Sequence, residues 1–170
     1  MNKLFWLIYI QPLHRIMIFM ILAAVLWGYL GNREQGSRRW RILNAAVFAG
    51  IAAVIFYMTV CARGEGTAEA VLVPFQNFRE AREQPELYRS MLMNVLLFFP
   101  IGLSLPFVLG KWKLSVPVTF VLACLFSAGI EYLQYLYSLG RCEVDDVIMN
   151  TLGALLGCSA RWISHSWKRK

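Results

Sequence analysis

Two pairs of polar residues lie at helical spacing within otherwise apolar sequence. Glu131 and Gln134 are three residues apart and Asp146 and Asn150 are four apart, so each pair shares one helix face. Arg141 lies in the short link between the pairs. Two carboxylates near an arginine suit acid–base chemistry on an anionic substrate, or the binding of a polar ligand. Together with an amide in an earlier apolar stretch, the predicted site residues are Asn94, Glu131, Gln134, Arg141, Asp146 and Asn150.

Each of these residues also has a structural explanation. Asp146 could cap the N-terminus of a helix, where a carboxylate accepts free backbone N–H groups. The amides of Asn94, Gln134 and Asn150 could bond neighbouring helices to one another. Glu131 is different, because an acid in an apolar stretch needs either a proton or a cationic partner. We therefore expect Glu131 to have a function.

Helix geometry restricts the partner of Glu131. If its helix continues to Leu139, Glu131 lies about 12 Å below the following turn, at about 1.5 Å per residue. An arginine side chain covers only part of that distance. We expect either that Arg141 folds back onto Glu131, or that Arg141 pairs with Asp146 near the mouth of the site. In the second case Glu131 is held by neighbouring amides, namely Gln134, Asn94 or Asn150.

The composition places these residues in a membrane protein. Of 170 residues, 58% are hydrophobic and 16% are charged, whereas about a quarter of the residues in soluble domains are charged. We predict an all-α fold, a polytopic transmembrane helical bundle that forms a single membrane domain over residues 1–170. The net charge of +7 comes from basic clusters at the ends of apolar runs, so no nucleic-acid partner is expected.

Five segments approach the length of about 20 apolar residues that a membrane-spanning helix needs. The link between the second and third segments is long, and the other links are short. The predicted spans are Leu13–Leu30, Ile42–Ala62, Met91–Leu109, Leu114–Leu139 and Asp146–Ile163.

The basic residues predict the orientation, because Lys and Arg concentrate on the cytoplasmic side of membrane proteins. Most of them lie in the link Gly31–Arg41, in the link between the third and fourth spans, and in the C-terminal tail. We expect these parts in the cytoplasm of a bacterium, with the C-terminus. In the long link Arg63–Ser90 four Arg are outnumbered by five Glu, so it should face outward. It should carry an apolar patch at Val71–Phe75 and a short amphipathic helix at Asn77–Tyr88.

Small residues predict close helix packing in the last span. Gly153 and Gly157 lie four residues apart on one face. We expect this face to pack within the chain, with a homo-oligomer through the same face as the alternative. The four cysteines lack CxxC spacing and a histidine at ligand spacing, so we predict no metal and no cofactor. Cys61 and Cys142 should lie near the same outer surface without forming a disulfide.

Several motifs resemble the VanZ-like family of membrane proteins. They have the order and spacing of that family over about residues 71–157, the VanZ-like core. The carrying segments are 72–75 (LVPF), 77–80 (NFRE), 94–102 (NVLLFFPIG), 131–134 (EYLQ), 140–141 (GR) and 146–153 (DVIMNTLG), running on to Gly157.

The resemblance implies a cell-envelope protein of Gram-positive bacteria that lowers sensitivity to teicoplanin-type lipoglycopeptide antibiotics. We favour a non-catalytic protein that binds or shields a membrane lipid or lipid-linked cell-wall component. Its site would be a polar pocket in the outer leaflet, bordered by Tyr132, Tyr135 and Tyr137. One alternative is an enzyme acting on a lipid-linked substrate, with Glu131 and Asp146 as an acid–base pair. A small transporter is the other.

Overall fold

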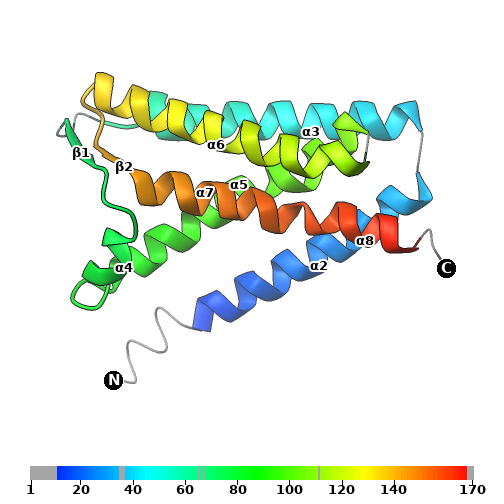
Figure 1. The fold of residues 1–170 in the computed structure, drawn as a ribbon, viewed down its shortest axis with the longest axis horizontal. Coiled ribbons are helices and arrows are strands. Elements are labelled where there is room, and N and C mark those ends of the chain that lie inside the picture. Colours follow the sequence, from blue (N-terminus) through cyan, green and yellow to red (C-terminus); the bar gives the residue numbers. More distant parts are fainter. Residues whose placement is uncertain (1–10, 35–36, 65, 67, 111, 168–170) are drawn as a thin grey trace.

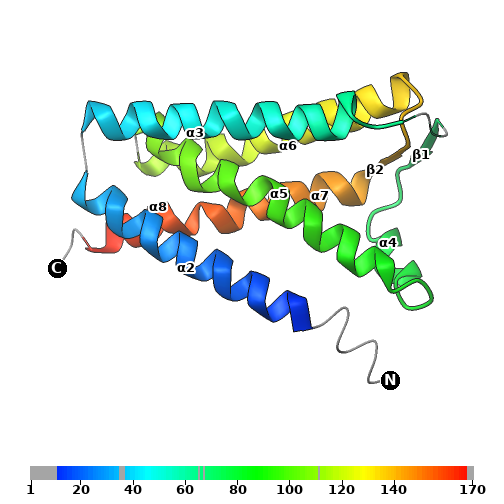
Figure 2. The same ribbon diagram turned by 180° about the vertical axis from the view of Figure 1, so that it is seen from behind.

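A helical bundle forms the chain, in agreement with the predicted fold class (Figures 1 and 2). The structure is a computed structural model that describes residues 11–34, 37–64, 66, 68–110 and 112–167. A short two-stranded sheet joins the helices at one end. In chain order the elements are α2 (Gln11–Arg33), α3 (Arg38–Phe56), η2 (Tyr57–Cys61), β1 (Glu69–Val71), α4 (Gln76–Glu80), α5 (Glu86–Leu109), α6 (Trp112–Leu136), β2 (Arg141–Glu143), α7 (Val144–Gly157) and α8 (Ser159–Trp167).

Four helical segments of the described chain are long and apolar enough to cross a membrane. They are Arg15–Arg33, Arg38–Cys61, Glu86–Leu109 and Lys113–Leu136. These segments correspond to the first four predicted spans, with ends that differ by a few residues. The second combines α3 with η2, a π-helix that continues it directly.

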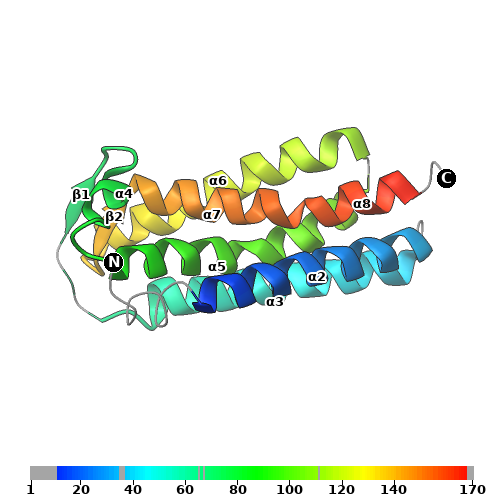
Figure 3. The same ribbon diagram turned by 90° about the horizontal axis from the view of Figure 1, so that it is seen from below.

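The fifth predicted span, Asp146–Ile163, is wrong as a single helix. This part of the chain forms α7, with 14 residues, and α8, with 9 residues. At the junction the Ser159 hydroxyl donates to the carbonyl oxygen of Leu156 at 2.6 Å. Local side-chain bonds of this kind compete with regular helix. Figure 3 shows α8 continuing in nearly the same direction as α7, so the two helices together take the place of the fifth span.

Three glycines allow α5 and α7 to pack backbone against backbone. A Cβ atom at Gly153 would lie 2.1 Å from the Val95 carbonyl oxygen, and one at Gly157 would lie 2.2 Å from that of Phe99. In the other direction, a Cβ atom at Gly102 of α5 would lie 1.8 Å from the Ala154 carbonyl oxygen of α7. The predicted packing of Gly153 and Gly157 within the chain is therefore confirmed, and this face is occupied by α5.

The long link Arg63–Ser90, called the outer link after its predicted orientation, contributes one strand of a pair that the sequence did not predict. β1 pairs in parallel with β2, so that Glu69 lies opposite Arg141 and Val71 opposite Glu143. Of the predicted apolar patch, Val71 is buried, whereas Leu72 remains exposed. The sheet therefore fixes the outer link against the turn between α6 and α7.

The predicted amphipathic helix Asn77–Tyr88 is wrong in extent. The structure has the short α4, which ends at Glu80, and a separate start of α5 at Glu86. Pro85 explains the interruption, because proline lacks a backbone N–H and disfavours helical conformation at the preceding residue.

The two ends of the bundle differ in composition. The α2–α3 link, the α5–α6 link and the end of α8 lie together at one end, which we call the basic end (Figures 1 and 3). β1, β2 and α4 lie at the opposite end, which we call the sheet end. The grouping of the basic links is therefore as predicted, although Lys111 and residues 168–170 lie outside the described residues. Exposure of the sheet end to the outside stays a prediction.

Candidate functional site

Glu131 is buried near the end of α6 and is held by the backbone of β2. Its side chain is 4% exposed, and its Oε2 accepts the backbone N–H of Glu143 at 3.0 Å. Both expectations for its partner are wrong, because neither Arg141 nor one of the three amides makes this bond. The strand pair brings Glu143 over the end of α6, and the sequence did not predict that pair.

Arg141 pairs with carboxylates of the sheet and not with Asp146. Its Nε lies 3.4 Å from Glu69 Oε2 and 3.4 Å from Glu143 Oε1. The register of the strands explains this choice, because Glu69 lies directly opposite Arg141. The expected pair between Arg141 and Asp146 is therefore wrong.

A second arginine, Arg63, lies close to the buried acids. Its positive charge acts on both Glu131 and Asp146, and its guanidinium carbon is 3.5 Å from the position of a Cβ atom on Gly140. Sequence reasoning missed this residue. A signal was present, because Arg63 is the single basic residue between positions 42 and 78 and directly follows the second predicted span.

Asp145, the neighbour of the predicted site residue Asp146, connects α7 to the outer link. Its two carboxylate oxygens accept the backbone N–H groups of Phe75 at 2.5 Å and of Asn77 at 2.8 Å. Phe75 has a positive φ of 61°, a conformation that is uncommon for residues other than glycine. Asp145 therefore holds the start of α4 in place, and sequence reasoning missed this role.

Asp146 lies in the first turn of α7 beside Asn94 of α5. It does not cap the helix as one interpretation expected, because the N-cap residue is Glu143, which makes no side-chain capping bond. The helix begins earlier than predicted since Val144 follows β2 directly. Asp146 is therefore the third residue of the helix and not its cap, and its carboxylate acts on Glu131.

Asn77 completes a network around the sheet. Its side chain is 3% exposed, and its Nδ2 donates to Glu143 Oε2 at 2.6 Å. Glu143 thus contacts Asn77 through one carboxylate oxygen and Arg141 through the other, while its N–H contacts Glu131. This residue is the centre of the network.

Gln134 and Asn150 bond neighbouring helices instead of joining Glu131. Gln134 Nε2 donates to the carbonyl oxygen of Thr59 in η2 at 3.0 Å. Asn150 Nδ2 donates to the Ser127 hydroxyl at 2.8 Å. For these two residues the contacts match the interpretation that their amides bond neighbouring helices to one another. The remaining four predicted site residues, Asn94, Glu131, Arg141 and Asp146, gather at the sheet end around Glu143 and Arg63.

Some polar atoms near this end are buried without a partner in the described part of the chain. They include Asn77 Oδ1, Gln134 Oε1 and Asn150 Oδ1. Buried polar groups are normally hydrogen-bonded, so these atoms can accept or donate further bonds. Among the described residues no three His, Cys, Asp or Glu side chains are grouped to hold a metal ion. The four cysteines are free thiols.

Comparison with known proteins identifies the family. A protein-family model described as VanZ/LLP1 matches residues 45–164, from α3 to α8. The chain is also 32% identical over 78 residues to the protein VanZ of Enterococcus faecium, covering 46% of this chain and 47% of that protein. The chain thus spans about half the length of this curated relative. No solved structure matches significantly. Because the family model covers well over half of its residues, the chain belongs to the VanZ/LLP1 family.

Proposed function

We propose that this VanZ/LLP1 protein binds the polar headgroup of a lipid or lipid-linked cell-wall component at the sheet end of its bundle. The binding lowers sensitivity to teicoplanin-type lipoglycopeptides by shielding that component from the drug. The sheet end faces the outside of a bacterial cytoplasmic membrane. The choice of teicoplanin as the drug comes from the resemblance to the VanZ-like family. The curated relative shares only part of its length with this chain.

The observation that carries the proposal is the group of acids and arginines at the sheet end, with Glu131 buried among them. Glu131 is buried, and Asp146 and Arg63 are its charged neighbours. Charged groups at the membrane are costly unless they are paired or functional. Carboxylates accept hydrogen bonds from hydroxyl and amide groups, and arginines donate them to phosphate groups. These are the chemical groups of lipid headgroups and sugars.

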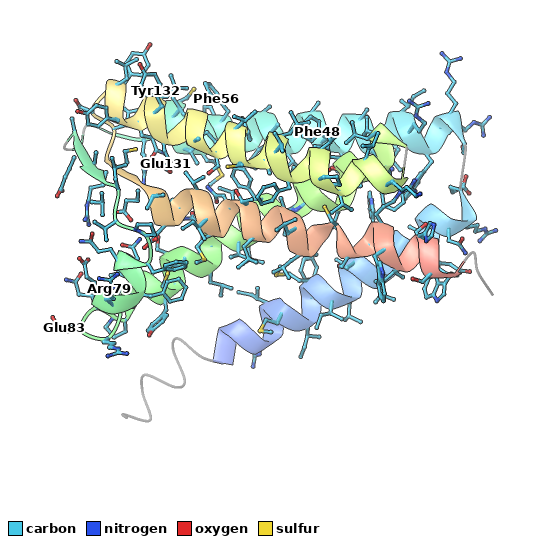
Figure 4. All side chains as sticks on the ribbon, in the orientation of Figure 1. Phe48, Phe56, Arg79, Glu83, Glu131 and Tyr132 are labelled. Atoms are coloured by element: carbon cyan, nitrogen blue, oxygen red, sulfur yellow. The ribbon has the colours of Figure 1, made fainter. Side chains whose placement is uncertain are left out.

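Exposed apolar and aromatic side chains lie at the same end of the bundle as this polar group. Leu72, Phe75 and Tyr132 are 69%, 54% and 62% exposed, and Figure 4 shows Tyr132 near Glu131 at the sheet end. Tyrosine is enriched where membrane and water meet. A ligand with an apolar tail and a polar head would match both parts of this surface.

The experiment that tests the proposal is lipid analysis of purified protein. We expect wild type to retain a lipid class that Glu131→Gln loses, because the amide keeps the size of the carboxylate but not its charge. Glu83→Gln is the matched control, since Glu83 is exposed on the outer link away from Glu131 (Figure 4). Identical retained lipids in wild type and Glu131→Gln would overturn the proposal.

An enzyme acting on a lipid-linked substrate is a second candidate, favoured by one observation. The charge of Asp146 acts on Glu131, so two carboxylates are available in one region for acid–base work. Whole-cell lipid extracts distinguish the two candidates. A lipid species that appears or disappears with the protein, and reverts in Glu131→Gln, supports catalysis, whereas unchanged lipids support binding alone.

A further inference from the structure

A groove at the basic end lies between α6 and the junction of α7 with α8. It has a volume of about 500 Å³ and mostly apolar walls that include Val116, Leu155 and Leu156. Figure 3 shows α6 separating from α7 and α8 toward this end. Cys158, the residue between the two helices, also lines the groove. The groove is far from Glu131, which lies at the other end of the bundle (Figure 4).

Two lining residues are typical of the boundary between hydrocarbon and headgroups. Trp162 lines the groove and is 62% exposed, and tryptophan is enriched at this boundary. Lys113 lies at the start of α6, is exposed, and also lines the groove. Lysine places its stem along apolar surface and its ammonium group in the headgroup layer. The groove therefore combines an apolar channel with a cation at its polar end.

The basic end of the bundle, where the groove lies, is strongly positive. The α2–α3 link contributes Arg33 and Arg38 to Arg41, against Glu34 as its one acidic residue. On α8, Arg161 donates to the carbonyl oxygen of Gly110 at 2.6 Å, which keeps a further cation beside the α5–α6 link. No acid occurs in residues 105–117 or 155–167. Basic clusters of this kind attract anionic lipids, at about 1 kcal/mol for each residue near the surface.

We infer that this groove binds an anionic phospholipid, with the phosphate at Lys113 and an acyl chain along Leu155 and Leu156. The site takes a lipid of the leaflet opposite to the one proposed for the sheet end. It uses none of the residues around Glu131. The inference consequently stands apart from the proposed function.

Native mass spectrometry of the purified full chain tests this inference, with phosphatidylglycerol and phosphatidylcholine as probes of equal chain length. We expect phosphatidylglycerol to be retained preferentially. Lys113→Gln should weaken its retention about five-fold, the equivalent of about 1 kcal/mol. Arg33→Gln is the matched control, because it removes the same charge at the same end from an exposed residue that does not line the groove.

A second variant tests the apolar part of the site. Leu155→Trp places a larger side chain in the groove and should reduce retention of both lipids, while circular dichroism reports whether the helices remain intact. Equal effects of Lys113→Gln and Arg33→Gln would show diffuse charge attraction and overturn the inference. Equal retention of the two lipids by wild type would overturn it as well.

Discussion

Backbone N–H groups, more than ion pairs, hold the acids of the sheet end. Glu131 accepts a bond from β2, and Asp145 accepts two from the outer link. Hydrogen bonds to charged groups contribute about 1.5–3 kcal/mol each. Arg141 meets its carboxylates at 3.4 Å from a side chain that is 36% exposed, where ion pairs contribute about 0–1 kcal/mol. The geometry of the site therefore depends chiefly on Glu131 and Asp145.

Replacing Asp145 should release the outer link. In Asp145→Asn one of the two acceptor oxygens becomes an amide nitrogen, which cannot accept the N–H of Phe75 or Asn77. We expect a loss of about 1–3 kcal/mol, seen as a lower melting temperature of the detergent-purified protein. Glu83→Gln, on an exposed residue, should leave the melting temperature unchanged. Equal melting temperatures for both variants would contradict the role of Asp145.

Cys142 offers a test of the charges around Glu131. Burial, and then the nearby charges of Glu131, Asp146 and Glu143, raise the pKa of the Cys142 thiol. A raised pKa means less thiolate at neutral pH, and the thiolate is the reactive form. Maleimide should therefore modify Cys142 more slowly than the exposed Cys61.

The same assay can separate the effect of the Glu131 charge on the pKa of Cys142 from the effect of burial. Glu131→Gln should lower the pKa of Cys142 and shift its rate-versus-pH curve to lower pH, because one negative neighbour is removed. Glu83→Gln, on an exposed residue that is not among the charges acting on Cys142, serves as the comparison. A curve that does not move in Glu131→Gln would place Glu131 away from the sheet.

At the scale of elements, the contact of α5 with α7 brings the site together. α5 carries Asn94 and α7 carries Asp146, and the glycines between these helices set their distance. Without an extensive hydrophobic driving force between helices in lipid, close backbone packing is a main source of association. The position of Asp146 relative to Asn94 therefore depends on residues far along both helices.

A methyl group at this contact should force the helices apart. In Gly102→Ala the new Cβ would lie 1.8 Å from the Ala154 carbonyl oxygen, and overpacking of this kind costs about 1–3 kcal/mol. Gly129→Ala is the matched control, because a Cβ there has no atom within 4 Å and alanine favours helix by about 0.5–1 kcal/mol. Thermal unfolding should show opposite shifts for the two variants. A Gly102→Ala protein as stable as wild type would contradict the contact.

The sequence was sufficient to predict where the long helices lie, but not to predict the hydrogen-bond partners of the site residues. Hydropathy located Met91–Leu109 well, because a span is a property of consecutive residues. The break at Cys158 was missed, since it depends on a local bond of Ser159. The bond from Phe75 to Asp145 was missed because it joins residues 70 positions apart, next to the unpredicted pair of β1 with β2. The bond from Glu143 to Glu131 was missed because strand β2 itself was not predicted.

At the scale of the whole molecule, the fold separates an acidic sheet end from a basic end. The four segments that can span a membrane run between these ends. Basic residues favour the cytoplasmic side, so the sheet end should be outside. The orientation decides whether Glu131 lies at the outer or the inner leaflet.

Cysteine labelling of intact cells tests this orientation. In a background with the native cysteines replaced, a membrane-impermeant maleimide should modify Glu83→Cys on the outer link and spare Arg39→Cys at the basic end. Both residues are exposed, so accessibility within the protein is matched. Permeabilised cells provide the control, in which both positions should react. The reverse pattern in intact cells would place the sheet end in the cytoplasm.

Glu131 is the residue on which the proposed function of the sheet end depends most directly. Teicoplanin susceptibility should be compared in cells that produce wild type, Glu131→Gln or Glu83→Gln at equal membrane levels. We predict that Glu131→Gln returns susceptibility to that of cells without the protein, whereas Glu83→Gln protects like wild type. Full protection by Glu131→Gln would contradict the central claim and leave Glu131 with a structural role.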